Sequence, residues 1–375
     1  MSRPFDLAVV GGGVGGAVTA LAAGRAGLSV VLFEPQPGPI DKPCGEGCLA
    51  GGVSVLSELG LDRLVARGAP LLHATYVQAG APPLRVPFAA PGRAFARREL
   101  AAEIAGLLER ESRVLRVPAG ARTEQLYGNG DERGRARFAL QAGGQRFESV
   151  CLAAADGLGG RAADWLRGLR SVDAARFGLR GRCTLRRGVE ASSGVTIHLR
   201  DAAGQIYLTP LPDRQLNVAL LLDRAPASGG AAASFLAALA HPEVAPLIDE
   251  VVTAPEARAL ARRPPRAVAR DGAFLVGDAA GGVDPVVGCG ISVALCTGVA
   301  AAGAARQLRD GRPAADVSAD YARVVRVETA QRLRLARLLL VLSRHPALAR
   351  SALRVLSRAP GLAAAIARAA ERSGR

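Results

Sequence analysis

The first forty residues contain two short apolar runs with a helical stretch between them. Phe5 to Val10 is typical of a buried strand, and Ser29 to Phe33 is a second such run that ends in Glu34. The residues between, Ala17 to Gly27, are long enough and apolar enough for a helix. We therefore expect a βαβ unit at the start of the chain.

Apolar and polar residues alternate through the middle of the chain, as in strands with one buried face. The alternating runs are Phe177 to Leu185, Gly194 to Leu199, Gln205 to Leu211 and Gln215 to Leu222. They predict an antiparallel sheet, which two shorter strands join, Leu71 to Val77 and Leu84 to Phe88. Two helices are predicted on this sheet, Ala231 to Ala240 and Glu243 to Val252.

The C-terminal tail, Ala314 to Arg375, has a helical pattern with breaks expected near Pro346 and Pro360. Its apolar face carries leucines between Leu333 and Leu342, and arginines are interspersed along it. A basic amphipathic segment can pack on the protein body with its arginines in solvent, or it can lie on an anionic membrane. Both interpretations stay open, so peripheral membrane contact through these helices is a hypothesis.

Composition narrows the function classes. The chain has 375 residues, of which 49% are hydrophobic, so it can bury a large core and is not disordered. Its formal net charge of +15 comes almost entirely from arginine, because Lys42 is the only lysine. Ala, Gly and Arg all have GC-rich codons, and we attribute much of the basicity to that bias. No arginine cluster is interleaved with aromatic residues, so nucleic acid is not an expected partner.

The cysteines and the N-terminus predict a cytoplasmic protein with reduced thiols. The chain reaches its first strand by Phe5 without a signal peptide, and no apolar run has the length of about 18 residues that a membrane span needs. No second His/Cys pair accompanies Cys44 and Cys48 at zinc-ligand spacing. The histidines His73, His241 and His345 show no constellation either. We therefore expect no metal site.

A glycine-rich turn joins the first strand to the first helix and predicts a dinucleotide site. Gly11 permits the tight turn, Gly13 leaves room for a pyrophosphate, and Gly16 lets the helix pack closely on the strand. The turn itself, with Val14 and Gly15, opens the helix, whose free N–H groups and positive dipole end attract phosphates. The carboxylate at the end of the second strand, Glu34, is placed to accept ribose hydroxyls and would repel a 2′-phosphate.

Three later segments carry a resemblance to a family. RREL at 97–100 resembles an RxxL element, and ADGLGGR at 155–161 resembles an ADGxxSxxR segment in which Gly160 replaces the usual serine. The third, FLVGDAAGGVDP at 274–285 with the turn through Ile291, is the most specific. Together with the glycine turn, these segments resemble the FAD-dependent superfamily of aromatic-hydroxylase-type monooxygenases and geranylgeranyl reductases.

This resemblance implies FAD as the cofactor and assigns residues to it. Arg97 would lie near the phosphates, with Arg98 as the alternative register, and Asp278 would bind the ribityl chain. The helix that begins after the 285–291 turn would direct its amides to the pyrimidine end of the flavin, where its dipole stabilises negative charge. The predicted FAD contacts beyond the glycine turn are Cys44, Gly45, Arg97, Asp156, Gly157, Gly277, Asp278, Pro285, Gly288, Gly290 and Ile291.

The resemblance also implies a fold class and a division into domains. The class is α/β, with a Rossmann-type FAD-binding domain, an antiparallel-sheet substrate domain and a C-terminal helical tail. The FAD-binding domain would be discontinuous, at 1–70, 95–165 and 265–310. The substrate domain would comprise 71–94 and 166–264, and the helical tail 311–375.

The segment KPCGEGC at 42–48 resembles a CGEG-type loop that lies close to the flavin ring in geranylgeranyl reductases and some hydroxylase-like relatives. Cys44 would then tune the flavin or touch substrate, and Glu46 would be a buried acid or base; the alternative is a rigid loop that closes over the cofactor. Cys289 lies in the later glycine turn, so a redox-active Cys44–Cys289 pair is a further hypothesis. His198 and Tyr207 lie in the predicted substrate sheet, with either a substrate-binding or a structural role.

These observations favour an FAD-dependent monooxygenase that hydroxylates an aromatic or polyketide-like molecule with O2, and NAD(P)H as transient electron donor. No second GxGxxG motif indicates where that donor docks. A prenyl reductase is the alternative: the Cys44 segment favours it, but IYLTPLP at 206–212 lacks the aromatic residues of the reductases' YxWxFP-like element. The absence of a WxWxIP element argues against halogenation. A flavin-binding protein without turnover is the third hypothesis.

Overall fold

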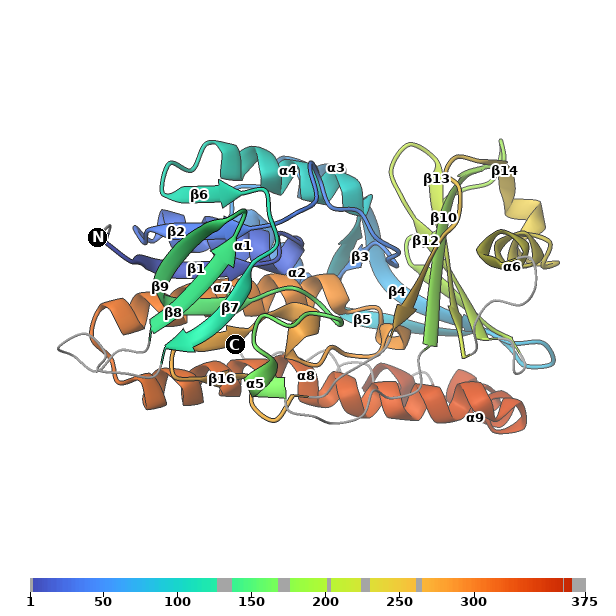
Figure 1. The fold of residues 1–375 in the computed structure, drawn as a ribbon. Coiled ribbons are helices and arrows are strands. Elements are labelled where there is room, and N and C mark those ends of the chain that lie inside the picture. The colour runs from blue at the N-terminus through green and yellow to red at the C-terminus, as the bar shows by residue number, and fades with distance from the viewer. Residues whose placement is uncertain are drawn as a thin grey trace.

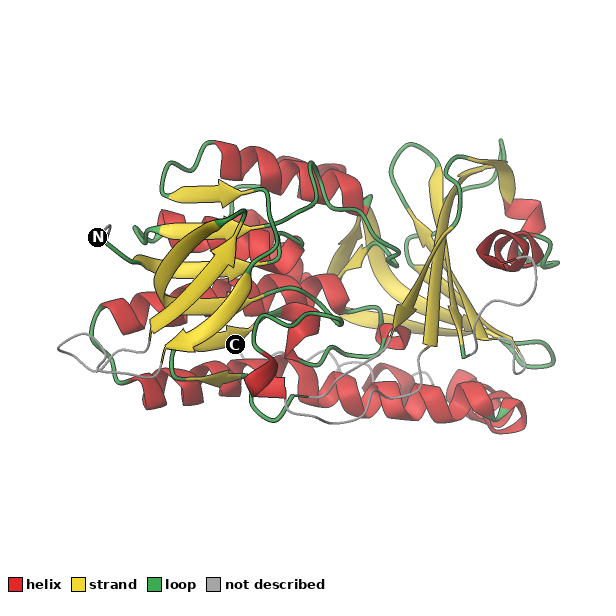
Figure 2. Ribbon diagram, in the orientation of Figure 1, coloured by secondary structure: helices red, strands yellow, loops and turns green. Residues whose placement is uncertain are grey.

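The computed structural model describes residues 3–126, 137–167, 176–200, 204–223, 230–260, 265–359 and 361–365. Its strands form two sheets, one at each end of an elongated molecule (Figure 1). Helices surround the first sheet, and the long C-terminal helices run beneath both sheets (Figure 2). The predicted α/β class is confirmed.

The first sheet is built around the predicted βαβ unit. β1 (Phe5–Val10) pairs in parallel with β2 (Val30–Phe33) and with β9 (Gln145–Ala154). Outward from this centre, β6 pairs in parallel with β2 and β17 in parallel with β9, while β16 is antiparallel to β17. β7 and β8 form an antiparallel extension on β9. The remaining strands of this sheet are β6 (Val114–Val117), β7 (Arg122–Leu126), β8 (Arg137–Ala142), β16 (Ala269–Arg270) and β17 (Ala273–Leu275).

Two helices, α1 (Val14–Arg25) and α7 (Gly290–Arg309), pack against each other over this sheet. A Cβ placed on Gly298 of α7 would lie 2.8 Å from the carbonyl oxygen of Gly15, so the two backbones approach as closely as glycine allows. α7 is long and apolar enough to cross a membrane, but 61% of its apolar window is buried inside the protein, which accounts for its composition. The other helices here are α2 (Ala50–Glu58), α3 (Asp62–Arg67), α4 (Arg97–Glu109) and α5 (Asp164–Arg167).

The second sheet confirms the strands predicted in the middle of the chain. Its strands run in the order β14-β10-β13-β12-β11-β4-β5-β3, with β15 also paired to β10, and all pairs are antiparallel except β11 with β4. The strands are β3 (Gly47–Cys48), β4 (Ala69–Val77), β5 (Leu84–Ala94), β10 (Arg176–Leu185), β11 (Val195–Arg200), β12 (Gly204–Pro210), β13 (Gln215–Leu222), β14 (Ile248–Val251) and β15 (Glu256–Leu260).

Alternation along these strands separates two faces. Ile206, Leu208 and Val218 point outward and pack with Phe235 of α6 (Gly230–Leu239) in one apolar cluster. The residues next to them along the strands, such as Tyr207 and Ala219, point inward toward the first sheet. They belong to a second apolar cluster. The inner face therefore forms one wall of the space between the two sheets.

The helix predicted at Glu243 to Val252 is wrong. That segment contains one 3-10 turn (Ala245–Leu247) followed by β14, which pairs with the edge of β10. Pro246 lies in the short turn, and the open backbone edge of β10 offers hydrogen bonds that a short surface helix cannot match. The helix predicted at Ala231 to Ala240 is confirmed as α6.

The C-terminal tail contains α8 (Ala314–Arg344) and α9 (Pro346–Arg358), so the break predicted near Pro346 is confirmed. The second predicted break, at Pro360, and residues 366–375 lie outside the described residues.

β3 pairs with β5, which ties residues 47–48 to the second sheet although the sequence places them in the FAD-binding domain. The domain limits stay a prediction.

Candidate functional site

The glycine turn after β1 has the geometry that its sequence predicts. Gly11 adopts a φ of +100°, and a Cβ there would lie 2.6 Å from the carbonyl oxygen of Ala155. A Cβ on Gly16 would lie 1.8 Å from the carbonyl oxygen of Gly11, so no side chain fits where α1 crosses the turn. Gly13 differs, because a Cβ there would meet nothing within 4 Å. Gly11 and Gly16 are thus required by packing, whereas Gly13 leaves space open beside the start of α1.

Four other glycines from three distant loops have the same open space in front of them and line the same cavity as Gly13. Because these glycines have no side chain and open space lies in front of them, a flat or extended ligand can approach their backbone closely. We call this surface the glycine cradle; it comprises Gly13, Gly45, Gly157, Gly288 and Gly290. All five are residues that the sequence assigns to the cofactor.

Glu34 ends β2 beside the glycine turn. Its Oε2 accepts a hydrogen bond from the Gly12 N–H at 2.7 Å, and its Oε1 accepts one from the Gln36 N–H at 2.9 Å. These backbone donors hold the carboxylate in place next to the turn, and each oxygen keeps a further lone pair for a hydroxyl group. The contact to ribose stays a prediction.

Arg97, at the start of α4, is buried and lines the cavity, whereas Arg98 is exposed. Of the two registers predicted for the RxxL element, only Arg97 reaches the site. Its Nε has no hydrogen-bond partner among the described residues although it is buried. A buried guanidinium N–H without an acceptor costs free energy, because the group has lost its hydrogen bonds to water. The Nε–H of Arg97 is therefore suited to bind an anion that enters the cavity.

Asp278 lies at the cavity in the turn that follows β17. The turn is anchored from α7, because the Gly277 N–H donates to Thr297 Oγ1 at 3.0 Å. Lys42 reaches Asp278 from the 41–48 loop, with Nζ and Oδ2 3.4 Å apart, and also lines the cavity. Burial lowers the pKa of Lys42, while the charge of Asp278 opposes that shift. The pair places one charge of each sign at the edge of the glycine cradle.

Asp156 explains why Gly160 replaces the serine of the family pattern. The Asp156 carboxylate accepts a hydrogen bond from the Ala162 N–H at 2.7 Å. A Cβ on Gly160 would lie 1.9 Å from the Asp156 carboxyl carbon, so a serine cannot occupy this position while Asp156 keeps its conformation. The Asp-Gly turn is intact, and Gly157, with φ +79°, lines the cavity.

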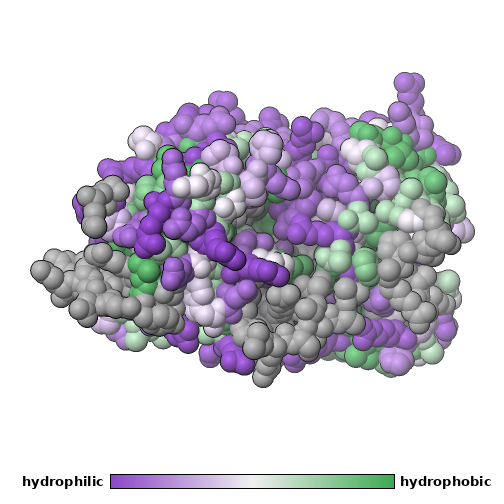
Figure 3. Space-filling model, viewed as in Figure 1, coloured by the Kyte–Doolittle hydropathy of each residue, from purple (hydrophilic) through white to green (hydrophobic). Residues whose placement is uncertain are grey.

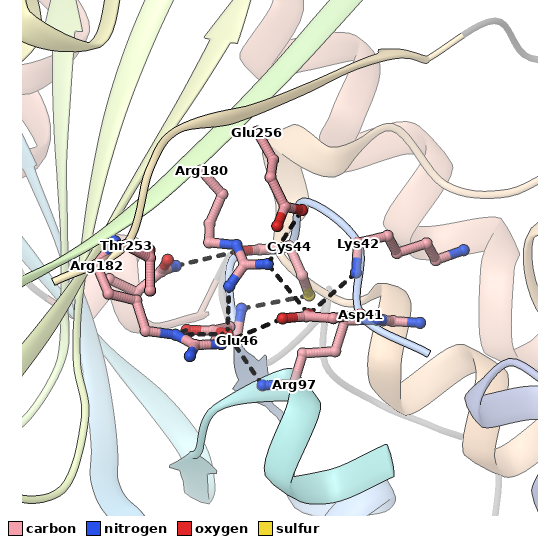
Figure 4. A network of polar contacts seen from close by, with 10 residues as sticks. Asp41, Lys42, Cys44, Glu46, Arg97, Arg180, Arg182, Thr253 and Glu256 are labelled. Atoms are coloured by element: carbon pink, nitrogen blue, oxygen red, sulfur yellow. Dashed lines mark hydrogen bonds and ion pairs between the residues drawn. The ribbon is translucent and has the colours of Figure 1, made fainter. Parts of the chain in front are cut away.

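Glu46 is the centre of a buried ionic network that holds the 41–48 loop against the second sheet (Figure 4). Its side chain is fully buried and lies 2.6 Å from Arg182 Nη2 and 3.4 Å from Arg180 Nη1, and it also accepts the Arg97 backbone N–H at 2.9 Å. Asp41 lies 3.1 Å from Arg180 on the other side. Burial works to lower the pKa of Arg182, but the hydrogen bond and charge of Glu46 outweigh it and raise that pKa.

This network bears on the predicted acid or base role of Glu46. Both carboxylate oxygens are engaged by guanidinium groups, so the carboxylate serves as the counter-charge of two buried arginines. Glu46 also has a φ of +59°, which is uncommon outside glycine and is held in place by these contacts. The arrangement favours the other alternative, a rigid loop that closes over the cavity.

A second ionic cluster fixes the turn before α7. The Arg176 guanidinium donates to Asp284 and to Asp223, each at 2.7 Å, and Asp284 also accepts the Val286 N–H. Tyr207 lines the cavity, and its hydroxyl donates to the Val286 carbonyl at 3.1 Å. Burial raises the pKa of Tyr207 well above its usual range. Tyr207 therefore stays a neutral phenol whose hydrogen is directed at the turn.

Sequence reasoning missed Arg176, Arg180 and Arg182. All three lie on the inner face of β10, at alternate positions of the strand except for Gly178 between the first two. The signal that could have found them was the recurrence of arginine on one face of a predicted strand. Arginines that become buried there need acidic partners, so this recurrence indicates buried ion pairs.

The cavity extends from the glycine cradle into an apolar region, with a volume of about 370 Å³. One wall is the inner face of the second sheet, including Ile197, Tyr207 and Leu221. The opposite wall comes from α8 and continues onto α9, where Leu353 and Leu356 line its far end. Most of the exposed lining is apolar, so the site excludes water from whatever it binds.

None of the six cysteines forms a disulfide in the structure. Cys44 is half-buried and lines the cavity, whereas Cys289 is buried and is not part of the lining. Burial raises the pKa of Cys289 to about 11 and that of Cys48, beside Ser292, to about 12. The Cys44–Cys289 redox pair stays a prediction, and the burial and raised pKa of Cys289 do not favour it.

His198 does not face the cavity. On β11 its neighbours Ile197 and Leu199 line the cavity, so His198 points to the opposite face of the sheet. There it meets His241, with ring centroids 5.4 Å apart, and Glu243, 2.9 Å from its Nδ1. Of the two roles predicted for His198, its position favours the structural one, whereas the statement that His241 shows no constellation is wrong. The reason is strand alternation, which sends neighbouring residues to opposite faces.

Comparison with known proteins shows what fold this is. No family model matches the chain. A segment of 61 residues is 41% identical to menaquinone reductase of two Mycobacterium tuberculosis strains, covering 16% of this chain and 15% of that protein. The chain therefore matches only a small part of these curated relatives.

Solved structures match over nearly the whole chain. They include p-nitrophenol 4-monooxygenase PnpA from Pseudomonas putida (17% identity, 98% of this chain and 96% of that chain, TM-score 0.80). The flavin-dependent brominase Bmp2 matches at 16% identity over 98% and 93%, with a TM-score of 0.76. A geranylgeranyl bacteriochlorophyll reductase-like protein from Thermoplasma acidophilum matches at 20% identity over 99% and 97%, with a TM-score of 0.73. The fold predicted from the sequence segments, that of the flavin-dependent oxidoreductases, is confirmed.

Proposed function

We propose that this protein is an FAD-dependent oxidoreductase, a monooxygenase that uses NAD(P)H and O2 to hydroxylate an apolar or aromatic small molecule. One observation carries the proposal: a cradle of bare glycine backbone opens directly into a water-excluding apolar cavity. The first part suits a dinucleotide, and the second suits an organic substrate at its reactive end. The flavin-dependent monooxygenase and halogenase structures with this fold support it.

The residues present fit FAD. The pyrophosphate would lie over Gly13 at the N-terminus of α1, whose amides and dipole favour an anion, with the unpartnered Nε of Arg97 beside it. Glu34 would accept ribose hydroxyls, and Asp278 would bind the ribityl chain. The amides around Gly288 and Gly290, at the start of α7, would face the pyrimidine end of the flavin.

The chain itself would contribute to the reaction by positioning the cofactor and the substrate and by excluding water from them. When bound, FAD would supply the redox chemistry, with NAD(P)H as the transient donor. The 41–48 loop, held by the Glu46 network, would keep Gly45 against the cofactor. The α7 dipole would stabilise negative charge on the reduced cofactor, and the leucines of α8 and α9 would keep bulk water away from the substrate.

The test starts with cofactor content and turnover. Purified protein is expected to show flavin absorbance and to oxidise NAD(P)H with matching oxygen uptake in the presence of small phenols and polyketide-like aromatics. A substrate product that gains one oxygen atom supports hydroxylation. Protein that stays colourless and does not bind added FAD would contradict the whole proposal.

A second candidate, saturation of prenyl double bonds, is favoured by the shape of the cavity. The apolar region continues from the sheet to Leu353 and Leu356 of α9, farther than a single aromatic ring requires. The similarity of one segment to menaquinone reductase agrees with a prenyl substrate. Anaerobic turnover separates the two candidates, because reduction adds hydrogen without oxygen, whereas hydroxylation stops when oxygen is removed.

A cavity-filling variant sharpens this comparison. Leu353→Trp would fill the far end of the cavity, and Leu348→Trp, at a position 50% exposed on the same helix, is its matched control. If the substrate is a long prenyl chain, Leu353→Trp should abolish its turnover while flavin content is unchanged. If the substrate is a small aromatic, both variants should turn over normally.

We also propose that α8 and α9 contact membranes peripherally. Leu338, Val341, Leu348 and Val355 are all about half exposed or more on these helices. Exposed arginines lie among them, at Arg337, Arg344, Arg354 and Arg358, which complements an anionic surface. Pelleting with anionic vesicles at low salt is the test; absence of binding would reject this contact, and neutral vesicles are the control. A cytoplasmic location stays a prediction.

The face seen in Figure 3 is largely hydrophilic, with hydrophobic residues gathered at the end that carries α6 and β14. The exposed apolar residues there are Leu236, Val251 and Val252. This patch lies at the outer side of the second sheet, so it does not belong to the cavity or to the membrane face proposed for α8 and α9.

A further inference from the structure

On the outer side of the second sheet, away from the apolar cavity, three metal-binding side chains meet. His198 comes from β11, while His241 and Glu243 come from the loop just after α6. The donor atoms that they offer all lie within 4.8 Å of one another. They line a pocket of about 270 Å³ together with residues 77–79 at the end of β4.

We propose that His198, His241 and Glu243 bind a divalent transition metal, with Zn²⁺ the best fit to the donor set. Two imidazoles and one carboxylate are a known ligand set for zinc, which binds histidine nitrogen at about 2.0–2.1 Å and carboxylate oxygen at about 2.0–2.2 Å. Calcium and magnesium prefer oxygen ligands alone, so the two histidines argue against them. Three protein ligands leave a fourth position for water.

The state of His198 is an independent reason to expect a ligand. Its side chain is 5% exposed, and its buried Nδ1 has no hydrogen bond of normal geometry among the described residues. Glu243 Oε2 lies 2.9 Å from that nitrogen, so one imidazole donor and one carboxylate donor already meet at this point. A cation between them would satisfy both atoms.

The other two ligands can adjust to the ion. His241 Nδ1 accepts a long hydrogen bond from the Glu243 N–H at 3.3 Å, and this contact is the one that His241 would give up if it bound the ion through Nδ1. Glu243 has 52% of its side chain exposed, and His241 is half-buried, so both can rotate without disturbing the core. Donors bound tetrahedrally to zinc lie about 3.4 Å apart, and closing from 4.8 Å therefore needs only rotamer changes.

The position of the site indicates a structural role. The ion would tie the loop after α6 to β11 across the outer face of the sheet. His198 is separated from the cofactor cavity by its own strand, because its neighbours Ile197 and Leu199 line that cavity. Metal binding should therefore stabilise the folded protein without supplying a catalytic group.

The experiment uses the full chain, freed of metal with a chelator, reduced, and titrated with Zn²⁺ alone by calorimetry. One ion per chain is expected, and saturation at 100 times Kd should lower the unfolding equilibrium constant about 100-fold and raise Tm. His241→Asn and Glu243→Gln should each weaken binding at least about 10-fold and reduce the Tm shift accordingly. The matched control, Glu250→Gln, alters another exposed acid and should bind as the unmodified chain does.

Two results would overturn the proposal. Zn²⁺ binding that is unchanged in both loop variants would place the ion elsewhere, for instance on the cysteines. Failure of the unmodified chain to bind micromolar Zn²⁺ would refute the site outright. Flavin content is measured in parallel, because neither variant touches the cavity and a loss of FAD would indicate misfolding instead.

Discussion

Replacing Glu46 by glutamine tests whether the buried network holds the 41–48 loop. The carboxylate is fully buried, lies 2.6 Å from Arg182 and 3.4 Å from Arg180, and accepts the Arg97 N–H. Glu46→Gln keeps the size of the side chain and removes its charge, which leaves two buried arginines short of one counter-charge. Removal of one partner from a buried ion pair costs about 3–5 kcal/mol.

For Glu46→Gln, the expected loss in the free energy of unfolding lies at the low end of that range. Asp41, 3.1 Å from Arg180, still compensates part of the charge, and the glutamine oxygen can accept one of the hydrogen bonds. We therefore expect a loss of about 3 kcal/mol in the free energy of unfolding. Because the same loop carries Gly45 of the cradle, FAD affinity should fall as well.

Urea unfolding followed by circular dichroism measures this loss, with m-values checked for constancy. Glu256→Gln is the matched control, since Glu256 is 53% exposed and 3.5 Å from Arg180 in the same network. Its loss should stay below about 1 kcal/mol, as for exposed ion pairs. If Glu46→Gln costs no more than Glu256→Gln, the network does not anchor the loop and the reasoning is refuted.

Three further predictions concern other parts of the site. Gly13→Val should weaken FAD binding at least about 10-fold without lowering Tm, because the space it fills is open, whereas Gly16→Ala should destabilise the fold by about 1–3 kcal/mol or more, which calorimetry would detect. A disulfide reagent at about pH 8 should modify Cys44 and be blocked by added FAD, while Cys48, with a pKa of about 12, stays unmodified; rapid modification of Cys48 would contradict its burial. Burial and the charge of Arg85 lower the pKa of His73 from 6.5, so the unfolded chain binds more protons than the folded chain just below that pH. The free energy of unfolding should therefore fall as pH drops below about 6.5. In urea titrations, His73→Gln should make the free energy of unfolding depend less on pH.

The local parts of the site could be predicted from sequence. The βαβ unit follows from apolar runs, and the glycine turn from conformations that only glycine adopts, as the φ of Gly11 shows. The register of the RxxL element needed the structure, which buries Arg97 and exposes Arg98. Periodicity also predicted the strands of the second sheet, because side-chain alternation is a property of each strand alone.

Tertiary structure decided the rest, since it depends on which face meets which partner. Alternation places His198 and Ile197 on opposite faces, but the chain must fold before one face becomes the cavity wall and the other meets the loop after α6. Glu46 and Arg182 are separated by 136 residues and pair only after the sheets come together. Segment 248–251 became a strand because β10 had an open edge beside it. Local patterns set backbone conformation, whereas the pairing of buried charges and strand edges is set by contacts between distant residues, which no single segment encodes.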